Sequence, residues 1–209
     1  MRAAADVLEE TGNEDAITLR GVARQVGIAA PSIYRHFKDV DAIVLAVVAD
    51  AFAELDAALE TAAGSAASVD RLRAVCVAYL DFARDRPHRY RVMFGRHRET
   101  RRSAAITEPR PADGLLGAAA FDTLATAVAA HLDSEPDRKA SAEATTLWVA
   151  LHGYASLHDA VPAFPWPEPA DMLDTLLERL VRSTDGTGRR GGDLLGEPCG
   201  VVLDEAEQR

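Results

Sequence analysis

Apolar residues recur at three- and four-residue steps along almost the whole chain, which is the period of amphipathic α-helices. Strand formers dominate no window, and no repeat of fixed period is present. We therefore expect an all-α fold. The pattern predicts helices over residues 2–11, 19–26, 31–37, 39–62, 68–85, 87–95, 115–132, 137–161 and 169–183.

Glycine and proline separate these segments. Gly12 and Gly27 can adopt the left-handed conformation that closes helices, and Gly64 with Ser65 indicates a turn after the fourth helix. Thr18 is placed to cap the second helix, and Asp39 lies where the fourth begins. Prolines begin or separate other helices, at Pro31, Pro87, Pro136 and, as a rigid connector, Pro162, Pro165, Pro167 and Pro169.

The same breaks suggest three units. Residues 1–46 form an N-terminal domain of three short helices, and residues 47–184 form a larger helical bundle. From residue 185 onward glycines dilute the apolar residues, so we expect 185–209 to be a flexible tail.

Residues 18–37 have the spacing of a helix-turn-helix. Val22 and Val26 face a core, Ala23 is small where two helices cross, and Gly27 supplies the turn. The next helix returns Ile28 and Ile33 to that core. Its outward positions are Ser32, Tyr34, Arg35 and His36, which we expect to face DNA.

Charge is unevenly distributed along the chain. The net charge of −10 argues against a polyanionic partner when taken alone. Residues 18–38 nevertheless contain no Asp or Glu and carry a local formal charge of +4, from Arg20, Arg24, Arg35 and Lys38. A basic N-terminal surface on an acidic molecule would approach DNA in one orientation.

The helix-turn-helix segment resembles that of the TetR family of transcriptional regulators. The matching residues are Leu19, Val22, Ala23, Gly27, Ile28, Ile33, Tyr34, His36 and Phe37. The alternative is an ordinary helical hairpin in which Tyr34 and Phe37 are core aromatics. The resemblance implies a three-helix DNA-binding domain, a helical ligand-binding and dimerisation bundle, and a double-stranded operator as partner.

By analogy with this family, DNA contacts are expected at nine positions. Tyr34, His36 and Lys38 would contact phosphates, and Thr18, at the start of its helix, would also contact the DNA backbone. Arg20 adds positive charge beside them. The positions that can reach base edges are Ala29, Ala30, Ser32 and Arg35.

The second half resembles the C-terminal domain named for its Trp-His-Gly signature, which some TetR-type regulators carry. Trp148, His152 and Gly153 match it. The resemblance implies a pocket for a small-molecule effector, although each lining residue, taken alone, fits the bundle core better than the pocket. The candidate ligand-binding residues are Tyr79, Phe82, Tyr90, Met93, Phe94, Phe121, Trp148, Leu151 and His152.

Two further surfaces follow from the sequence. The last helix repeats apolar residues at Met172, Leu173, Leu176, Leu177, Leu180 and Val181, a stripe wide enough for both the bundle and a second copy of the chain. The resemblance implies a homodimer through the last two long helices. Residues 84–102 hold eight arginines. Three roles are open for them: a second nucleic-acid surface, a gate for an anionic ligand, or a solvated helix edge and loop.

Other classes of protein find little support. Cys76 and Cys199 are expected to be free thiols. Neither a phosphate-binding glycine loop nor a serine-nucleophile elbow is present, so we expect no catalytic residues and no cofactor. His152 and His158 point to different helix faces, so no metal site is expected, except through residues distant in sequence. No apolar stretch is long enough to span a membrane, and we expect a cytoplasmic protein.

The sequence therefore predicts a ligand-responsive, DNA-binding transcriptional regulator, with repression as the commoner mode of the family it resembles. One alternative is a DNA-binding protein controlled by a protein partner. The other is a helical metal sensor or enzyme. The identity of the effector and the operator sequence are left open.

Overall fold

The computed structural model describes residues 18–25, 27, 29, 32, 37–67, 70–94 and 116–181. These parts of the chain form helices joined by turns and contain no strand, so the all-α expectation is confirmed. The helices are α2 (Leu19–Gln25), α4 (Val40–Ser65), α5 (Arg71–Asp85), α6 (Pro87–Phe94), α8 (Ala118–His131), α9 (Arg138–Ala160) and α10 (Pro169–Leu180).

Most helix boundaries lie within a few residues of the predicted ones. Asp39 caps α4 by accepting a hydrogen bond from the amide of Ala42 at 2.8 Å. The turn predicted at Gly64 and Ser65 is wrong, because both lie in the last turn of α4. There the Ser65 hydroxyl donates to the Thr61 carbonyl at 2.7 Å. The predicted helices over 2–11 and 31–37 and the tail lie largely or wholly outside the described residues.

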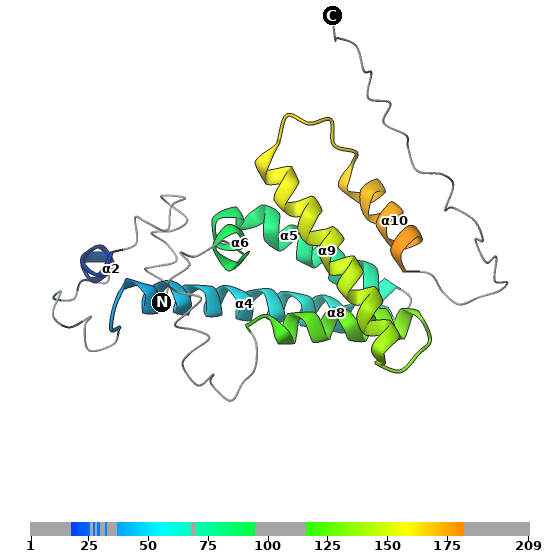
Figure 1. Cartoon of the computed structure of the whole chain (residues 1–209), viewed down its shortest axis with the longest axis horizontal. Coiled ribbons are helices and arrows are strands. Elements are labelled where there is room, and N and C mark those ends of the chain that lie inside the picture. The colour runs from blue at the N-terminus through cyan, green and yellow to red at the C-terminus, as the bar shows by residue number, and fades with distance from the viewer. Residues whose placement is uncertain are drawn as a thin grey trace, which may run out of the picture.

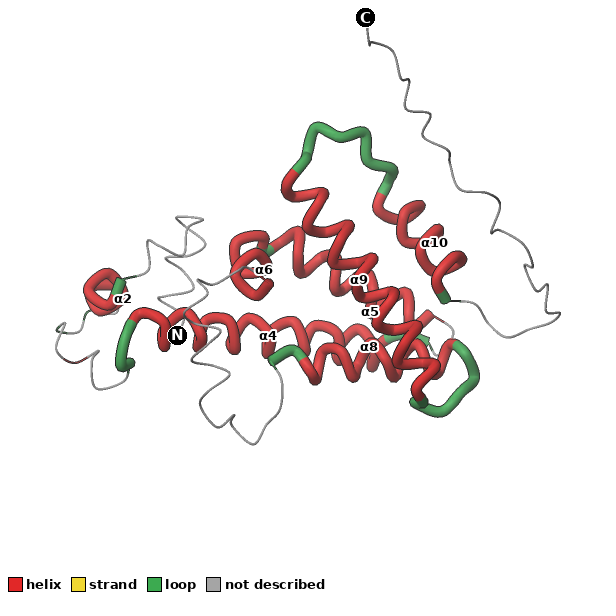
Figure 2. Tube along the Cα trace, viewed as in Figure 1, coloured by secondary structure: helices red, strands yellow, loops and turns green. Residues whose placement is uncertain are grey.

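The helices are arranged around α4, which runs almost the length of the molecule (Figure 1). α5 and α8 pack against α4, and α9 packs across both of them. α10 lies on α9 and α5, while α6 lies between α5 and the N-terminal half of α4. Figure 2 shows that a long connector joins α9 to α10 at one end of the bundle.

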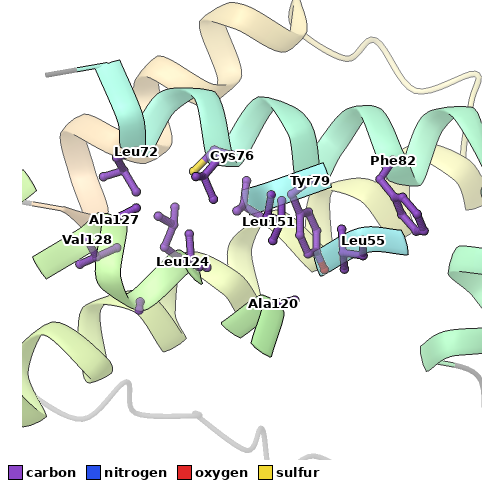
Figure 3. Packing of buried hydrophobic residues seen from close by; sticks show 14 of the residues in the cluster. Leu55, Leu72, Cys76, Tyr79, Phe82, Ala120, Leu124, Ala127, Val128 and Leu151 are labelled. Carbon is purple, nitrogen blue, oxygen red and sulfur yellow. The ribbon is translucent and has the colours of Figure 1, made fainter. Parts of the chain in front are cut away.

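Two hydrophobic cores lie along this axis. The N-terminal core is formed by α2, the first half of α4 and one residue of α6, and consists of Val22, Ala23, Ile43, Val44, Val47, Val48 and Val92. The bundle core is larger and joins α4, α5, α6, α8, α9 and α10 (Figure 3). Its fully buried side chains include Leu55, Leu59, Val75, Val128, Leu147, Leu151 and Leu173.

α4 belongs to both cores. Ile43, Val44, Val47 and Val48 are buried in the N-terminal core, and Ala51, Leu55 and Leu59 are buried in the bundle core. Phe52 packs against both. A single continuous helix therefore links the two cores.

Candidate DNA-binding and effector-binding sites

α2 is fixed by local contacts at both ends. The hydroxyl of Thr18 accepts a hydrogen bond from the Gly21 amide at 3.0 Å, so the predicted cap is confirmed. A Cβ atom at Gly21 would lie 2.8 Å from this oxygen, so the close approach favours glycine. Gly27 follows the helix with φ of +71°, the left-handed conformation predicted for the turn.

The described residues on the inner face of α2 pack as the sequence predicts, while Val26, Ile28 and Ile33 lie outside the described residues. Val22 and Ala23 are buried against Ile43, Val44 and Val47 of α4. Leu19 and Phe37 are partly buried at the edge of the same core. The N-terminal core thus holds α2 in a fixed orientation on the end of α4 (Figure 1).

The described residues on the opposite face of α2 and in the segment after it are accessible to solvent. Thr18, Arg20, Ala29 and Lys38 are exposed and Ser32 is half-buried, so each described candidate for DNA contact is accessible. The remaining candidates lie outside the described residues, namely Ala30, Tyr34, Arg35 and His36.

The candidate effector residues do come together, in two layers. The inner layer is buried and consists of Tyr79, Phe82, Tyr90, Met93 and Leu151. The outer layer is half-buried and consists of Phe94, Phe121, Trp148 and His152, which we call the aromatic layer. Every residue of the two layers except His152 lies in the bundle core or packs against it. His152 contacts the ring of Tyr90, which belongs to that core.

A chain of hydrogen bonds joins the two layers. The hydroxyl oxygens of Tyr79 and Tyr90 lie 2.8 Å apart, and that of Tyr90 lies 2.8 Å from Nδ1 of His152. The chain connects α5, α6 and α9 through Tyr90. Such a chain satisfies polar groups that would otherwise be costly to bury.

Burial controls the ionisation of this chain. Desolvation raises the pKa of Tyr79 to about 12 and also raises that of Tyr90. Desolvation lowers the pKa of His152 below its ordinary value of 6.5. All three side chains are therefore neutral at pH 7 and act as hydrogen-bonding groups.

Two surface hollows lie beside the bundle rather than between the two layers. One, of about 400 Å³, is lined by Ala58 of α4 and by α5 residues that include Phe82. The other, of about 360 Å³, lies between α8 and the start of α9 and is lined by residues that include Phe121. Each hollow includes only one of the nine candidate residues.

The described half of the basic run is neutralised by carboxylates. Arg84 contacts Asp81 and Asp85, and Arg91 lies 3.0 Å from Asp159 on α9. Two further arginines reach α4, where Arg86 and Arg89 approach Glu54 at 3.4 Å and 2.5 Å. These pairs favour the solvated edge over a second nucleic-acid surface for residues 84–91. The other four arginines lie outside the described residues.

The outer face of α9 is unusually free of charge. From residue 144 to residue 157 the helix contains no Asp, Glu, Lys or Arg. On this face Val149 is 62% exposed and Leu157 is 54% exposed. Between them, a Cβ atom at Gly153 would meet nothing within 4 Å. Solvent-exposed helices usually carry charged side chains, so this face has the composition of an interface.

Two family models match the chain. Residues 1–47 match the model described as bacterial regulatory proteins of the tetR family, and residues 72–184 match the tetracyclin repressor-like C-terminal domain. The chain belongs to the TetR family of transcriptional regulators. The resemblance seen in residues 18–37 is therefore confirmed, and the chain is a DNA-binding regulator with a helix-turn-helix.

Solved structures agree with this assignment. A Rhodococcus sp. RHA1 protein of unknown function is 26% identical, with a TM-score of 0.67 over 87% of this chain and 93% of that one. A TetR family transcriptional regulator from Thermus thermophilus, PfmR, is 15% identical and shares the fold, with a TM-score of 0.58 over 89% of this chain and 100% of that one. None of the curated protein sequences matches the chain.

Several residues that complete this TetR-family structure were not identified from the sequence. Phe52 packs against both cores, Val92 is buried in the N-terminal core, and Glu54 and Asp159 hold the arginines of α6. Glu54 is 35 residues from Arg89, and no local pattern reports a pair so far apart. Only the apolar period of α4 could have indicated Phe52.

The described parts of the chain contain neither a metal-binding cluster nor a membrane-spanning helix. No group of three or more His, Cys, Asp or Glu side chains is placed to hold a metal ion there. Within the same residues, none of the helices has the length and hydropathy needed to cross a membrane. Cys76 is a free, buried thiol whose pKa burial raises to about 12.

Proposed function

We propose that this TetR-family protein is a repressor that binds a pseudopalindromic operator as a homodimer in the cytoplasm and leaves it when a small molecule binds within residues 47–184. The observation that carries the proposal is the course of α4. This single helix is buried in the N-terminal core with α2 and in the bundle core with the candidate effector residues. DNA binding by residues 1–46 and effector binding are thereby mechanically connected.

The proposed DNA contacts divide into positioning and reading. Tyr34, His36 and Lys38 contact phosphates, with Thr18 and Arg20 on the neighbouring helix. Reading of base edges falls to Ala29, Ala30, Ser32 and Arg35, where alanine methyl groups suit thymine and arginine suits guanine. The exposure of the described members supports these roles. If each protomer makes about three charged phosphate contacts, through Arg20, Lys38 and Arg35, which can pair with a phosphate as well as with guanine, the logarithm of affinity falls with the logarithm of salt at a slope near −5.

The proposed dimer uses the outer face of α9 together with α10. The uncharged run from residue 144 to residue 157 supports this choice. Leu173 on α10 and Val181, which directly follows this helix, are buried in the bundle core. Leu176, Leu177 and Leu180 of α10 are only partly buried against the same core. The predicted stripe therefore retains apolar surface for a second copy.

Replacing Val149 by Asp tests this interface. A charge at the centre of the face must be desolvated in the dimer, so V149D should be monomeric in light scattering at concentrations where the wild type is dimeric. The control is Val77→Asp on α5, which is also exposed and lies on a different helix face. If V149D remains dimeric, the second copy does not bind this face.

The proposed signal is a change in the separation of the two reading helices. An effector within the bundle displaces α4, and each copy of α2 moves with it because the N-terminal core attaches the two. Spin labels at Arg24, an exposed position of α2 outside the proposed DNA contacts, would measure this distance in the dimer. An unchanged distance alongside lost DNA binding would contradict the mechanism.

The operator can be found by selecting duplexes from a random pool on the purified protein. We expect enrichment of an inverted repeat whose half-sites are separated by one or more helical turns, because two-fold dimers read two-fold sites. Failure to enrich any sequence from the pool would overturn the proposed function. An enriched single, non-repeated site would instead overturn only the dimeric mode of reading.

A further inference from the structure

The aromatic layer consists of four rings that stay partly open to solvent. Its members come from three helices, with Phe94 on α6, Phe121 on α8, and Trp148 and His152 on α9. Ring centroids lie 4.4 Å apart for Phe94 and His152, 6.3 Å for Phe94 and Trp148, and 6.0 Å for Phe121 and Trp148. None of the three contacts is a parallel stack, since the interplanar angles are 52° to 66°. Because all four side chains are half-buried, part of each ring remains open to contact with a further aromatic group.

No ion pair of the described residues lies in this layer. The charged side chains of α6 are engaged elsewhere, since Arg89 approaches Glu54 on α4 and Arg91 approaches Asp159 at the end of α9. Within the described parts of the chain, the buried set contains no charged residue. An anionic ligand placed among these rings would lose its hydration without gaining a counter-charge from them.

The layer does offer one directional polar contact. His152 is neutral at pH 7 because burial lowers its pKa. Its Nδ1 is engaged by the Tyr90 hydroxyl at 2.8 Å, so Nε2 is the nitrogen through which it can bind a ligand. In a neutral imidazole the two nitrogens have opposite roles, one donating and one accepting. A hydroxyl group can meet Nε2 in either tautomer, because a hydroxyl both donates and accepts.

We propose that the effector is an uncharged, flat aromatic molecule bearing a hydroxyl group, which packs on the partly exposed rings of Trp148, Phe94 and Phe121 and hydrogen-bonds to His152. This inference rests on the proposed function, because it names the ligand of the same site. Aromatic faces favour a flat aromatic ring over an aliphatic ring of similar size. The single neutral polar contact favours a hydroxyl over a carboxylate.

Three probes of similar size separate these chemistries in calorimetric titrations at pH 7.5. 2-Naphthol is aromatic and uncharged, 2-naphthoate is aromatic and anionic, and 2-decalol is uncharged and aliphatic. We expect 2-naphthol to bind at least about tenfold more tightly than either of the others. Tighter binding of the anion would overturn the uncharged class, and equal or tighter binding of 2-decalol would overturn the aromatic class. Absence of binding by all three would also overturn the inference.

Variants locate the binding. Trp148→Leu and His152→Leu should each weaken 2-naphthol binding about tenfold, whereas Trp166→Phe in the α9–α10 connector should leave it unchanged. If Trp148→Leu fails to fold by circular dichroism, Phe121→Leu, at another half-buried ring of the layer, replaces it. Equal affinity in wild type and layer variants would place the ligand elsewhere.

Duplex binding measured on the same preparations separates the two proposals. If the protein binds the selected operator but the three probes do not show the expected order of affinities, the proposed ligand class is wrong and the DNA-binding function stands. Loss of operator binding in the wild type removes the proposed function, whatever the probes show.

Discussion

Tyr90 and Val92 lie two residues apart on α6, yet their side chains are buried in different cores. Tyr90 joins the bundle core and the hydrogen-bond chain to His152, whereas Val92 packs among the valines of α4 that support α2. An eight-residue helix thus contacts both halves of the molecule. Together with α4 it gives two physical connections between the candidate effector site and the helix-turn-helix.

Replacing Val92 by Ala tests the smaller connection. We expect a loss of about 2 kcal/mol in the free energy of unfolding, because two buried methyl groups are removed and a small cavity remains. Denaturant titration measures this change. The same substitution at Val77, which is 39% exposed, should have almost no effect. Equal costs at the two positions would show that Val92 is not packed in a core.

Two tyrosines offer a matched test of the hydrogen-bond chain. Tyr90→Phe removes a hydroxyl that contacts Tyr79 and His152, and should cost about 1–3 kcal/mol of stability. The buried hydroxyl of Tyr154 has no hydrogen-bond partner in the described structure, so Tyr154→Phe should be neutral or slightly stabilising. Thermal unfolding at one protein concentration compares both variants. A larger loss for Tyr154→Phe than for Tyr90→Phe would contradict this geometry.

The lowered pKa of His152 predicts a dependence of stability on pH. Below the ordinary value of 6.5 the unfolded chain binds a proton at this residue more readily than the folded chain does. His152 therefore makes the folded state less stable as the pH falls below 6.5. Between pH 7.5 and 5.5, His152→Gln should lose less stability than the wild type, as measured by denaturant titration. A greater loss in the variant would reverse the sign of the pKa shift.

Two aspartates cap long helices in the same way. Asp39 and Asp137 each accept a hydrogen bond from the amide three residues later at 2.8 Å, at the starts of α4 and α9. Replacing either by Ala should cost about 1 kcal/mol, whereas Asn, which also caps helices, should preserve most of the stability. Melting temperatures of the four variants test this expectation. An Asn variant as unstable as the Ala variant would indicate a role for the charge.

The sequence was informative where structure depends on neighbouring residues. Asp39, Pro87 and Pro169 mark helix starts through capping or a fixed φ, and Thr18 and Gly27 bound α2 for similar reasons. The turn predicted at Gly64 was wrong because a glycine near the end of a helix can either follow the helix or lie in its last turn. In α4 the hydrogen bonds of Thr61 and Ser65 to carbonyls of the preceding turn accompany the continuation of the helix.

The candidate effector site was predictable as a group and not in its internal arrangement. The Trp-His-Gly motif and the aromatic residues identified the members of both layers. Their division into buried and half-buried rings depends on how α6, α8 and α9 cross, which no local pattern specifies. The pairing of Arg89 with Glu54 similarly requires α6 to lie against α4. Neutralisation of residues 84–91 could therefore be seen only in the folded chain.

The central claim is that residues 18–38 bind duplex DNA through outward-facing polar and basic side chains. The most direct test measures duplex affinity over a range of salt concentrations for the wild type and for the triple variant Tyr34→Ala, His36→Ala, Lys38→Ala, with Arg84→Ala as a control. We predict a slope near −5 for the wild type and the control. For the triple variant we predict affinity at least about tenfold weaker and a slope smaller in magnitude by about two, because the dimer loses two lysines. Unchanged affinity and slope in a folded, dimeric triple variant would contradict the account.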